Sequence, residues 1–232
     1  MKILIVTDAW YPQINGVVRT LTKTRDHLIA MGQTVELITP GSFRTIPCPT
    51  YPEIRLSIFP GKKVAETIKF LQPDAIHIAT EGPLGLAARR YATSHGLNFT
   101  TAYHTRFPEY VRSRIGLPLR ITYMFLRWFH GSSQSVMAPT QTVISDLAKW
   151  RIGSPVLWPR GVDLSIFNPD NRSVKHRCEH TDGLAKSMAQ LDAAKSPVFI
   201  YVGRVAVEKN LGDFLDLKLP GEKHIVGDGP AL

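Results

Sequence analysis

Short apolar runs alternate with helical patterns along the first 158 residues. Most of these runs lack a polar position every second residue, as expected for parallel strands that are covered on both faces. The runs predict strands at residues 3–7, 35–39, 75–79, 99–103, 135–138 and 156–158. Strands that alternate with helices are typical of βαβ units around a parallel sheet, so the pattern predicts an α/β, Rossmann-like domain.

The helices between these strands are predicted from a period of three to four residues. Between the first two strands, Val17, Leu21 and Leu28 fall on one side of a helix that Gly32 can end in a left-handed conformation. Further helices are predicted at residues 64–71, 84–94 and 143–150, and Gly96 ends the second of them. Residues 40–60 contain five prolines, which predicts a long surface connection rather than a helix or a central strand.

The pattern changes after residue 164. The chain is then polar, with a short helix predicted near residues 184–194, until a new apolar run begins at residue 198. We predict an N-terminal domain at residues 1–164, a linker at 165–196 and the start of a second domain at 197–232. Two strands and one helix are expected in this last part, too few to bury a core of useful size.

Composition and charge limit the compartment and the partners. The chain has two cysteines without a Cys-x-x-Cys spacing and no apolar stretch near the ~20 residues of a membrane span, so we expect a cytoplasmic protein. Lys and Arg exceed Asp and Glu by 19 to 10 up to residue 168, and are balanced, 9 to 9, after it. This charge favours phosphate, anionic lipid or nucleic acid as a partner, without choosing among them.

Three loops follow predicted strands, where open parallel sheets bind ligands. In the first, Gly16 lets an anion approach a helix start, although the same residues would also form a plain Asn-Gly turn. In the second, His104 can hydrogen-bond a sugar hydroxyl, although a lone histidine is more often structural. In the third, Arg204 and Lys209 can bind a diphosphate, although charged turns are common on any surface.

Taken together, four strings resemble the retaining glycosyltransferases of the GT-B fold. They are YPQINGV at residues 11–17, YHT at 103–105 with PEY at 108–110, RGVD at 160–163, and GR at 203–204 with EKN at 208–210. The most similar branch includes GDP-mannose-dependent α-mannosyltransferases and sulfoquinovosyl transferases. Four motifs in a shared order are far more specific than a single glycine loop.

The resemblance implies a role for each motif. It implies donor binding by Asn15, Gly16, Arg204, Lys209 and Gly229, catalysis at His104, and an interdomain position for Arg160, Gly161 and Asp163. The reaction implied is transfer of a hexosyl group, here a mannosyl group from GDP-mannose, to a lipid or glycan acceptor with retention. No Asp-x-Asp sequence is present, so no metal and no other cofactor is expected.

Two other functions remain open. The carboxylate pair of the family's Glu-x7-Glu segment lies later in the family's sequence than this one extends, so we expect a C-terminally truncated chain that binds a nucleotide sugar weakly. An inactive fragment or pseudoenzyme is therefore one alternative. A sugar-phosphate epimerase with a similar two-domain fold is the other, although the motifs at 160–163 and 203–210 argue against it.

A basic, aromatic segment at residues 118–129 also has two interpretations. Ile121, Met124 and Trp128 lie on one predicted helix face together with Phe125 and Phe129. This face can pack in the core. The resemblance alternatively implies contact with the acceptor or with an anionic membrane at its inner face, by the residues Tyr110, Arg112, Arg120 and Arg127. Nucleic acid is not expected, since no nucleic-acid-binding motif accompanies the charge.

Overall fold

The computed structural model describes residues 1–13, 15–48, 51–104, 108, 112, 116–166, 168 and 197–229, with the side chains of all but 51–53 and 208. The chain divides into two compact units, Met1–Gly161 and Val162–Leu232. Almost all of the predicted linker, including the helix predicted near residues 184–194, lies outside the described residues.

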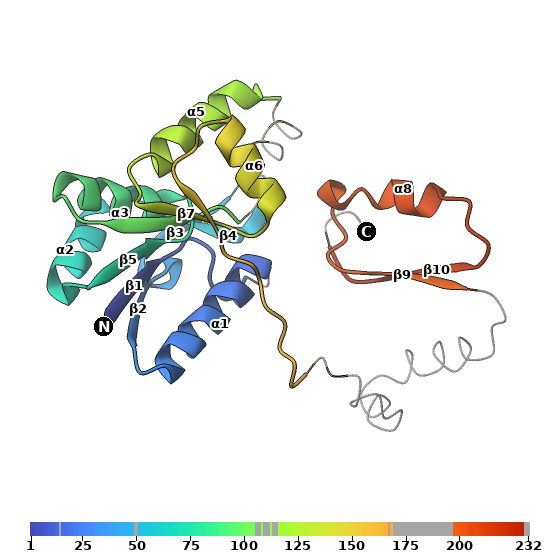
Figure 1. Ribbon diagram of the computed structural model, residues 1–232, viewed down its shortest axis with the longest axis horizontal. Coiled ribbons are helices and arrows are strands. Elements are labelled where there is room, and N and C mark those ends of the chain that lie inside the picture. The colour runs from blue at the N-terminus through green and yellow to red at the C-terminus, as the bar shows by residue number, and fades with distance from the viewer. Residues whose placement is uncertain are drawn as a thin grey trace. The chain divides into compact units, whose positions relative to one another are not determined.

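A parallel sheet of six strands forms the centre of the first unit (Figure 1). Its strands are β1 (Lys2–Val6), β2 (Thr34–Ile38), β5 (Ala75–Ile78), β6 (Phe99–Ala102), β7 (Ser135–Ala138) and β8 (Pro155–Leu157). All six predicted strands are confirmed. Their order across the sheet is β2-β1-β5-β6-β7-β8, with every pair parallel. The order reverses between β1 and β5, and ligands of open α/β sheets bind beyond the carboxyl ends of the strands at such a reversal.

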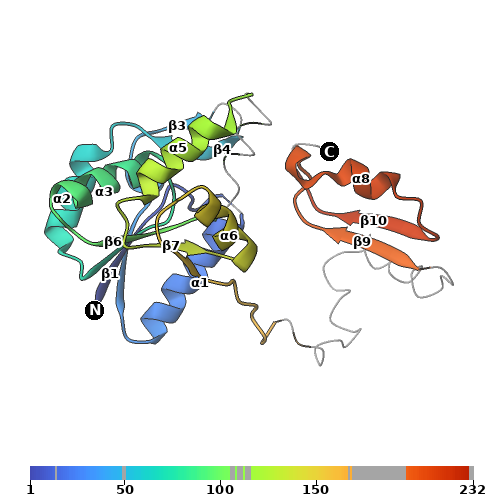
Figure 2. The ribbon, with the colours of Figure 1, turned by 45° about the horizontal axis from the view of Figure 1, so that its top comes forward.

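Helices cover both faces of this sheet (Figure 2). They are α1 (Gly16–Ala30) on one face and α2 (Gly61–Leu71), α3 (Pro83–Ser94), α5 (Leu119–His130) and α6 (Gln141–Lys149) on the other. Alternate residues of β1 show the division: Leu4 and Val6 pack with α2, α3 and α5, whereas Ile3 and Ile5 pack with Leu21 of α1. Because both faces are buried, most positions in these strands are apolar.

The proline-rich segment contains a hairpin that the sequence did not reveal. A short 3₁₀ turn at Pro40–Ser42 leads into β3 (Thr45–Cys48), which pairs antiparallel with β4 (Tyr51–Ser57) in a separate sheet of two strands. Proline is tolerated here because each strand has an edge without a partner strand in this sheet. The predicted surface connection is therefore correct only in that the segment avoids helix and central sheet.

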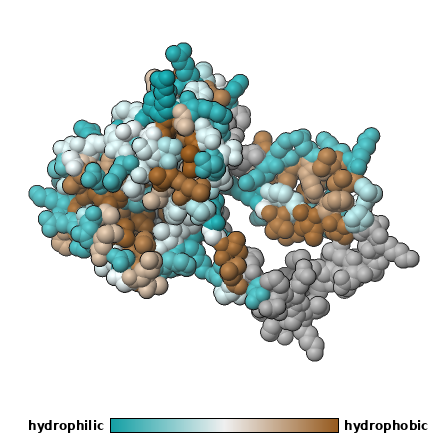
Figure 3. All heavy atoms as spheres, viewed as in Figure 1, coloured by the Kyte–Doolittle hydropathy of each residue, from teal (hydrophilic) through white to brown (hydrophobic). Residues whose placement is uncertain are grey.

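The described part of the second unit is small. It consists of β9 (Val198–Val202), a 3₁₀ turn at Val207–Lys209, α8 (Leu211–Asp216) and β10 (Glu222–Val226). The two strands pair in parallel. Apolar side chains gather over these strands (Figure 3), where Ile200, Val202, Ile225 and Val226 are exposed.

Candidate active site

The helix after β1 begins with a side-chain cap. Asn15 is extended, and its Oδ1 accepts hydrogen bonds from the N–H groups of Val17 and Val18, both at 3.0 Å. Its Nδ2 donates to Oε1 of the buried Gln13 at 3.2 Å. The side chain of Asn15 is thus held by the helix that it caps. The positive end of the helix dipole lies at the carboxyl edge of the sheet, beside Gly16.

Gly16, His104 and Arg160 come from three different loops and lie together. Arg160 follows β8, and its Nη2 donates to the carbonyl oxygen of His104 at 3.3 Å, across 56 residues of sequence. Its Nη1 lies 3.0 Å from the position that a Cβ on Gly16 would occupy. The first unit therefore holds a guanidinium beside the start of α1, and both groups favour an anion such as a phosphate.

His104 is a neutral imidazole at physiological pH. Burial lowers the pKa of His104 to about 4; the nearby Glu81 opposes this shift, and the cationic Arg160 adds to it. Its Nε2 is buried and has no hydrogen-bond partner within the described part of the chain. A neutral ring can offer this nitrogen to a hydroxyl group, either as donor or as acceptor according to its tautomer.

The ring of Trp158 packs beside His104, and His77 packs against the same indole. The rings of His104 and Trp158 are 6.0 Å apart between centroids, and His77 meets the same indole edge to face at 5.7 Å. Burial, with a smaller effect of His104, lowers the pKa of His77 to about 4. Sequence reasoning missed both residues. His77 could have been found as the single polar residue in the apolar run of β5, where it lies between Ile76 and Ile78.

Asp8 joins the loops after β1 and β5. One carboxylate oxygen accepts from the N–H of Leu84 at 2.9 Å, and the other accepts from Thr80 Oγ1 at 2.8 Å and from the N–H of Gly85 at 3.3 Å. Burial raises the pKa of Asp8 above its usual value, although these hydrogen bonds oppose the shift. Asp8 therefore caps α3 from another loop, at the point where the strand order reverses. The sequence did not single it out.

Glu81, in the same loop, faces the buried His130 of α5. Its Oε1 lies 3.4 Å from Nε2 of His130, while Nδ1 of that ring lies 2.8 Å from Thr101 Oγ1. Thr101 uses its only hydroxyl proton to donate to Ser133 Oγ, so we assign the proton of the ring to Nδ1.

The second unit contains the two residues that are predicted to bind a diphosphate. Arg204 is half-buried and Lys209 is exposed. Tyr201 stabilises the turn at residues 201–204, because its hydroxyl donates a hydrogen bond to the carbonyl of Arg204 at 2.9 Å. A Cβ on Gly229 would lie 2.0 Å from the carbonyl oxygen of Val205, so glycine is needed there for backbone packing. Donor binding by these residues stays a prediction.

The remaining predicted residues are placed as follows. Gly161 is the last residue of the first unit, and Asp163, in the second, accepts hydrogen bonds from the N–H and the hydroxyl of Ser165 at 3.2 and 2.6 Å. Tyr110 lies outside the described residues. Arg112, Arg120 and Arg127 are exposed.

Helix α5 packs with one face and exposes apolar side chains on another. Tyr123, Leu126 and Phe129 are buried in the core. Ile121, Met124 and Trp128 are 46%, 62% and 53% exposed. The core-packing interpretation of this segment therefore holds for Phe125 and Phe129 but is wrong for the three exposed residues, which we call the α5 apolar surface.

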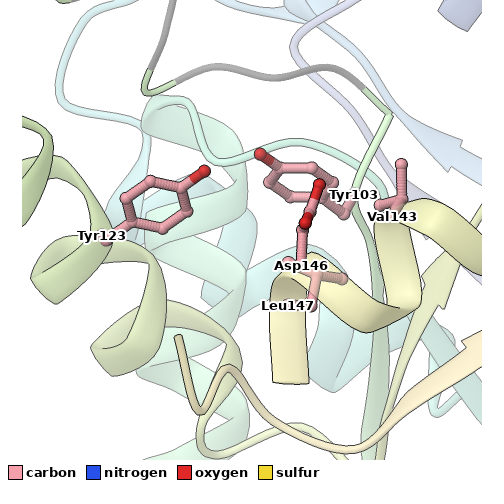
Figure 4. A pocket seen from close by; sticks show the side chains of 5 residues that line it. All are labelled: Tyr103, Tyr123, Val143, Asp146 and Leu147. Carbon is pink, nitrogen blue, oxygen red and sulfur yellow. The ribbon is translucent and has the colours of Figure 1, made fainter. Parts of the chain in front are cut away.

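A small cavity lies between the end of β6, α5 and α6 (Figure 4). The hydroxyl ends of Tyr103 and Tyr123 point toward one another there, and the carboxylate of Asp146 lies beside Tyr103. The volume is about 10 Å³, near that of one water molecule. A sugar does not fit, so this cavity is not a substrate site.

Comparison with known proteins identifies a family. The family model described as Glycosyltransferase Family 4 matches residues 14–166. The chain is 28% identical to sulfoquinovosyl transferase SQD2 of Arabidopsis thaliana over 81% of this chain and 36% of that protein. It is 25% identical to a GDP-mannose-dependent alpha-mannosyltransferase of Mycobacterium tuberculosis over 99% of this chain and 63% of the relative.

The fold is also found in a solved structure. Sucrose-phosphate synthase of Thermosynechococcus elongatus superposes with a TM-score of 0.62 at 18% identity, covering 97% of this chain and 61% of the other. With the parallel sheet, this likeness confirms the predicted α/β, Rossmann-like architecture of the GT-B class. The chain spans between about a third and two thirds of the length of these relatives.

Proposed function

We propose that this chain, which belongs to glycosyltransferase family 4, serves the transfer of a hexosyl group from a nucleotide sugar to a lipid or glycan acceptor with retention. The observation that carries the proposal is the meeting of Gly16, His104 and Arg160 in the first unit. GDP-mannose is the proposed donor, supported by the mannosyltransferase among the relatives.

The chemistry proposed for the site is stabilisation of a leaving diphosphate. As the bond between the anomeric carbon and the phosphate oxygen breaks, negative charge grows on the phosphate, and the start of α1 with the Arg160 guanidinium stabilises it. The neutral His104 contacts a hydroxyl group of the sugar. The acceptor oxygen then bonds to the anomeric carbon on the same face, and its proton passes to the departing phosphate.

Arg204 and Lys209, in the second unit, are also proposed to bind a diphosphate, with Gly229 near the nucleotide. The reaction is proposed to need no metal ion. Within the described ranges, no group of three His, Cys, Asp or Glu side chains is placed to hold one. A phosphate held by guanidinium and ammonium groups is neutralised by these charges instead.

The acceptor side is proposed to lie at an anionic membrane. The α5 apolar surface stands beside the exposed Arg120 and Arg127, which matches a helix that rests in the headgroup region. No helix in the described part of the chain is long and apolar enough to span a bilayer. A cytoplasmic location at the inner face of the membrane is proposed with this contact.

The test is transfer of radiolabel from GDP-mannose or UDP-glucose to a lipid extract. We expect labelled lipid from GDP-mannose, and loss of at least about 90% of the rate in His104→Ala and Arg160→Ala. Exposed Arg151→Ala is the matched control and should keep the full rate. An inactive fragment would label nothing with either donor, and an epimerase would convert a nucleotide sugar or sugar phosphate without an acceptor. Either result would refute the proposal.

A further inference from the structure

A cavity of about 170 Å³ lies between the loop after β1 and the β3–β4 hairpin. The loop contributes Trp10, Tyr11 and Gln13, and the hairpin with the turn before it contributes Phe43, Thr45 and Arg55. Pockets for drug-sized ligands measure about 300–1,000 Å³. This cavity is therefore large enough for one polar ring and too small for a whole lipid.

Aromatic side chains line part of the cavity, and two basic residues lie beside them. The rings of Trp10 and Tyr11 meet edge to face at 5.6 Å. Arg25 lies 5.9 Å from the Trp10 ring and is paired with Asp26 at 2.7 Å, whereas Lys63 lies 5.1 Å from the ring of Phe43. Aromatic faces suit the apolar faces of sugar and cyclitol rings, and Lys63 favours a ligand with negative charge.

The exposed Arg55 supplies a cation at the wall of the cavity. Its Nε donates to Thr45 Oγ1 at 3.1 Å and its Nη2 donates to the carbonyl of Thr45 at 3.4 Å. These bonds use two of the five N–H groups of a guanidinium and orient the rest. Among the described residues that line the cavity, none is acidic. The polar groups thus match a phosphate, which a guanidinium binds through two parallel hydrogen bonds.

The cavity adjoins the proposed transfer site through Gln13. The side chain of Gln13 forms part of the cavity wall, donates to the carbonyl of Asp8 at 3.3 Å and accepts from Asn15, the cap of α1. Gly16 follows Asn15 and lies against Arg160. A ring bound in the cavity would therefore lie next to the start of α1, where an acceptor hydroxyl has to meet the donor sugar.

We propose that this cavity is the acceptor subsite and that it takes a single polar ring carrying a phosphate. Arg55 binds the phosphate, and the aromatic side chains of Trp10 and Phe43 contact the ring. This inference rests on the proposed function, and adds the chemical class of the acceptor. The phosphorylated ring can come from a lipid headgroup or from a free sugar phosphate.

The first test is calorimetric titration of the chain with glucose 6-phosphate and, separately, with glucose. We expect glucose 6-phosphate to bind at least about tenfold more tightly, as one charge-assisted hydrogen-bonded contact allows. Arg55→Gln should remove this difference and Arg55→Lys should retain part of it. The control is Arg44→Gln, an exposed arginine of the same hairpin region that does not line the cavity. Equal affinities for the two sugars, or equal effects of the two glutamine variants, would overturn the proposal.

A second arm separates the two sources of the ring. Phosphatidylcholine vesicles with and without phosphatidylinositol are sedimented with the wild type and with Arg55→Gln. Phosphatidylinositol-dependent binding that falls in the variant indicates a lipid headgroup. Vesicle binding that is unchanged in the variant, with glucose 6-phosphate binding that depends on Arg55, indicates a free sugar phosphate. Dependence on Arg55 in neither arm would overturn the inference.

Titration with GDP-mannose keeps this inference apart from the proposed function. We expect Arg55→Gln to leave the affinity for GDP-mannose unchanged, because Arg55 does not line the site of Gly16, His104 and Arg160. A wild-type chain that binds glucose 6-phosphate through Arg55 but transfers no sugar would refute the proposed function alone. Equal rates of sugar transfer by the wild type and by Arg55→Gln would refute the acceptor subsite alone.

Discussion

Replacing Gly16 with alanine tests whether sugar transfer requires the contact between Arg160 and the start of α1. The added Cβ would lie 3.0 Å from Nη1 of Arg160, closer than most carbon contacts in proteins, so the guanidinium has to move by a few tenths of an ångström. Its hydrogen bond to the His104 carbonyl is already 3.3 Å long. We expect a shift of that size to lengthen this bond beyond the range of a real hydrogen bond.

The size of the effect follows from the lost contact. A hydrogen bond from a charged donor contributes about 1.5–3 kcal/mol, and the exposure of Arg160 places this one near the lower end. We therefore expect Gly16→Ala to lower kcat/KM for mannosyl transfer by about tenfold. The free energy of unfolding should stay equal or rise by up to about 1 kcal/mol, because alanine favours a helix over glycine.

The chain offers a matched control. Gly61 is the first residue of α2, as Gly16 is of α1, and a Cβ there meets no atom within 4 Å. Gly61→Ala should keep the full transfer rate. In an Arg160→Ala background, Gly16→Ala should have no further effect, since the two changes act through one contact. Equal rates for Gly16→Ala and Gly61→Ala, or full additivity with Arg160→Ala, would refute the reasoning.

Three further predictions concern stability and membrane binding. Between pH 6.5 and about 4, His77 and His104 bind protons in the unfolded chain but not in the folded one, so stability should be full above pH 6.5 and fall as the pH drops. Each histidine contributes up to roughly 3 kcal/mol, and His77→Gln should flatten the pH dependence of denaturant unfolding; an unchanged slope would contradict the burial argument. Gly82→Ala would place a Cβ 2.4 Å from Cγ of Asp8 and should lower the free energy of unfolding by about 1–3 kcal/mol, measured in urea, whereas Gly41→Ala should not. Met124→Glu should reduce sedimentation with anionic vesicles by about tenfold or more and leave neutral vesicles unaffected; equal binding of both proteins would exclude the α5 apolar surface as the contact.

Local sequence was sufficient for most elements of the sheet. Parallel strands covered on both faces favour apolar residues at consecutive positions, and this preference is visible in the sequence at β1, β5 and β7. Helix ends were also readable, because Gly32 and Gly96 adopt the positive φ angles, 79° and 64°, that other residues rarely reach. The β3–β4 hairpin was missed because prolines usually interrupt strands, and only its position outside the main sheet makes them tolerable.

The amino-acid sequence by itself determined the class of fold, the loop that presents Gly16 and the presence of a histidine after the fourth strand of the main sheet. Tertiary structure decided which of these residues meet. Arg160 reaches His104 and Gly16 because β8 and β6 end at the same edge of one sheet, and Asp8 caps α3 because β1 and β5 are neighbours. Period and propensity describe residues a few positions apart, whereas these contacts join residues 56 and 76 positions apart, so only the packed sheet could specify them.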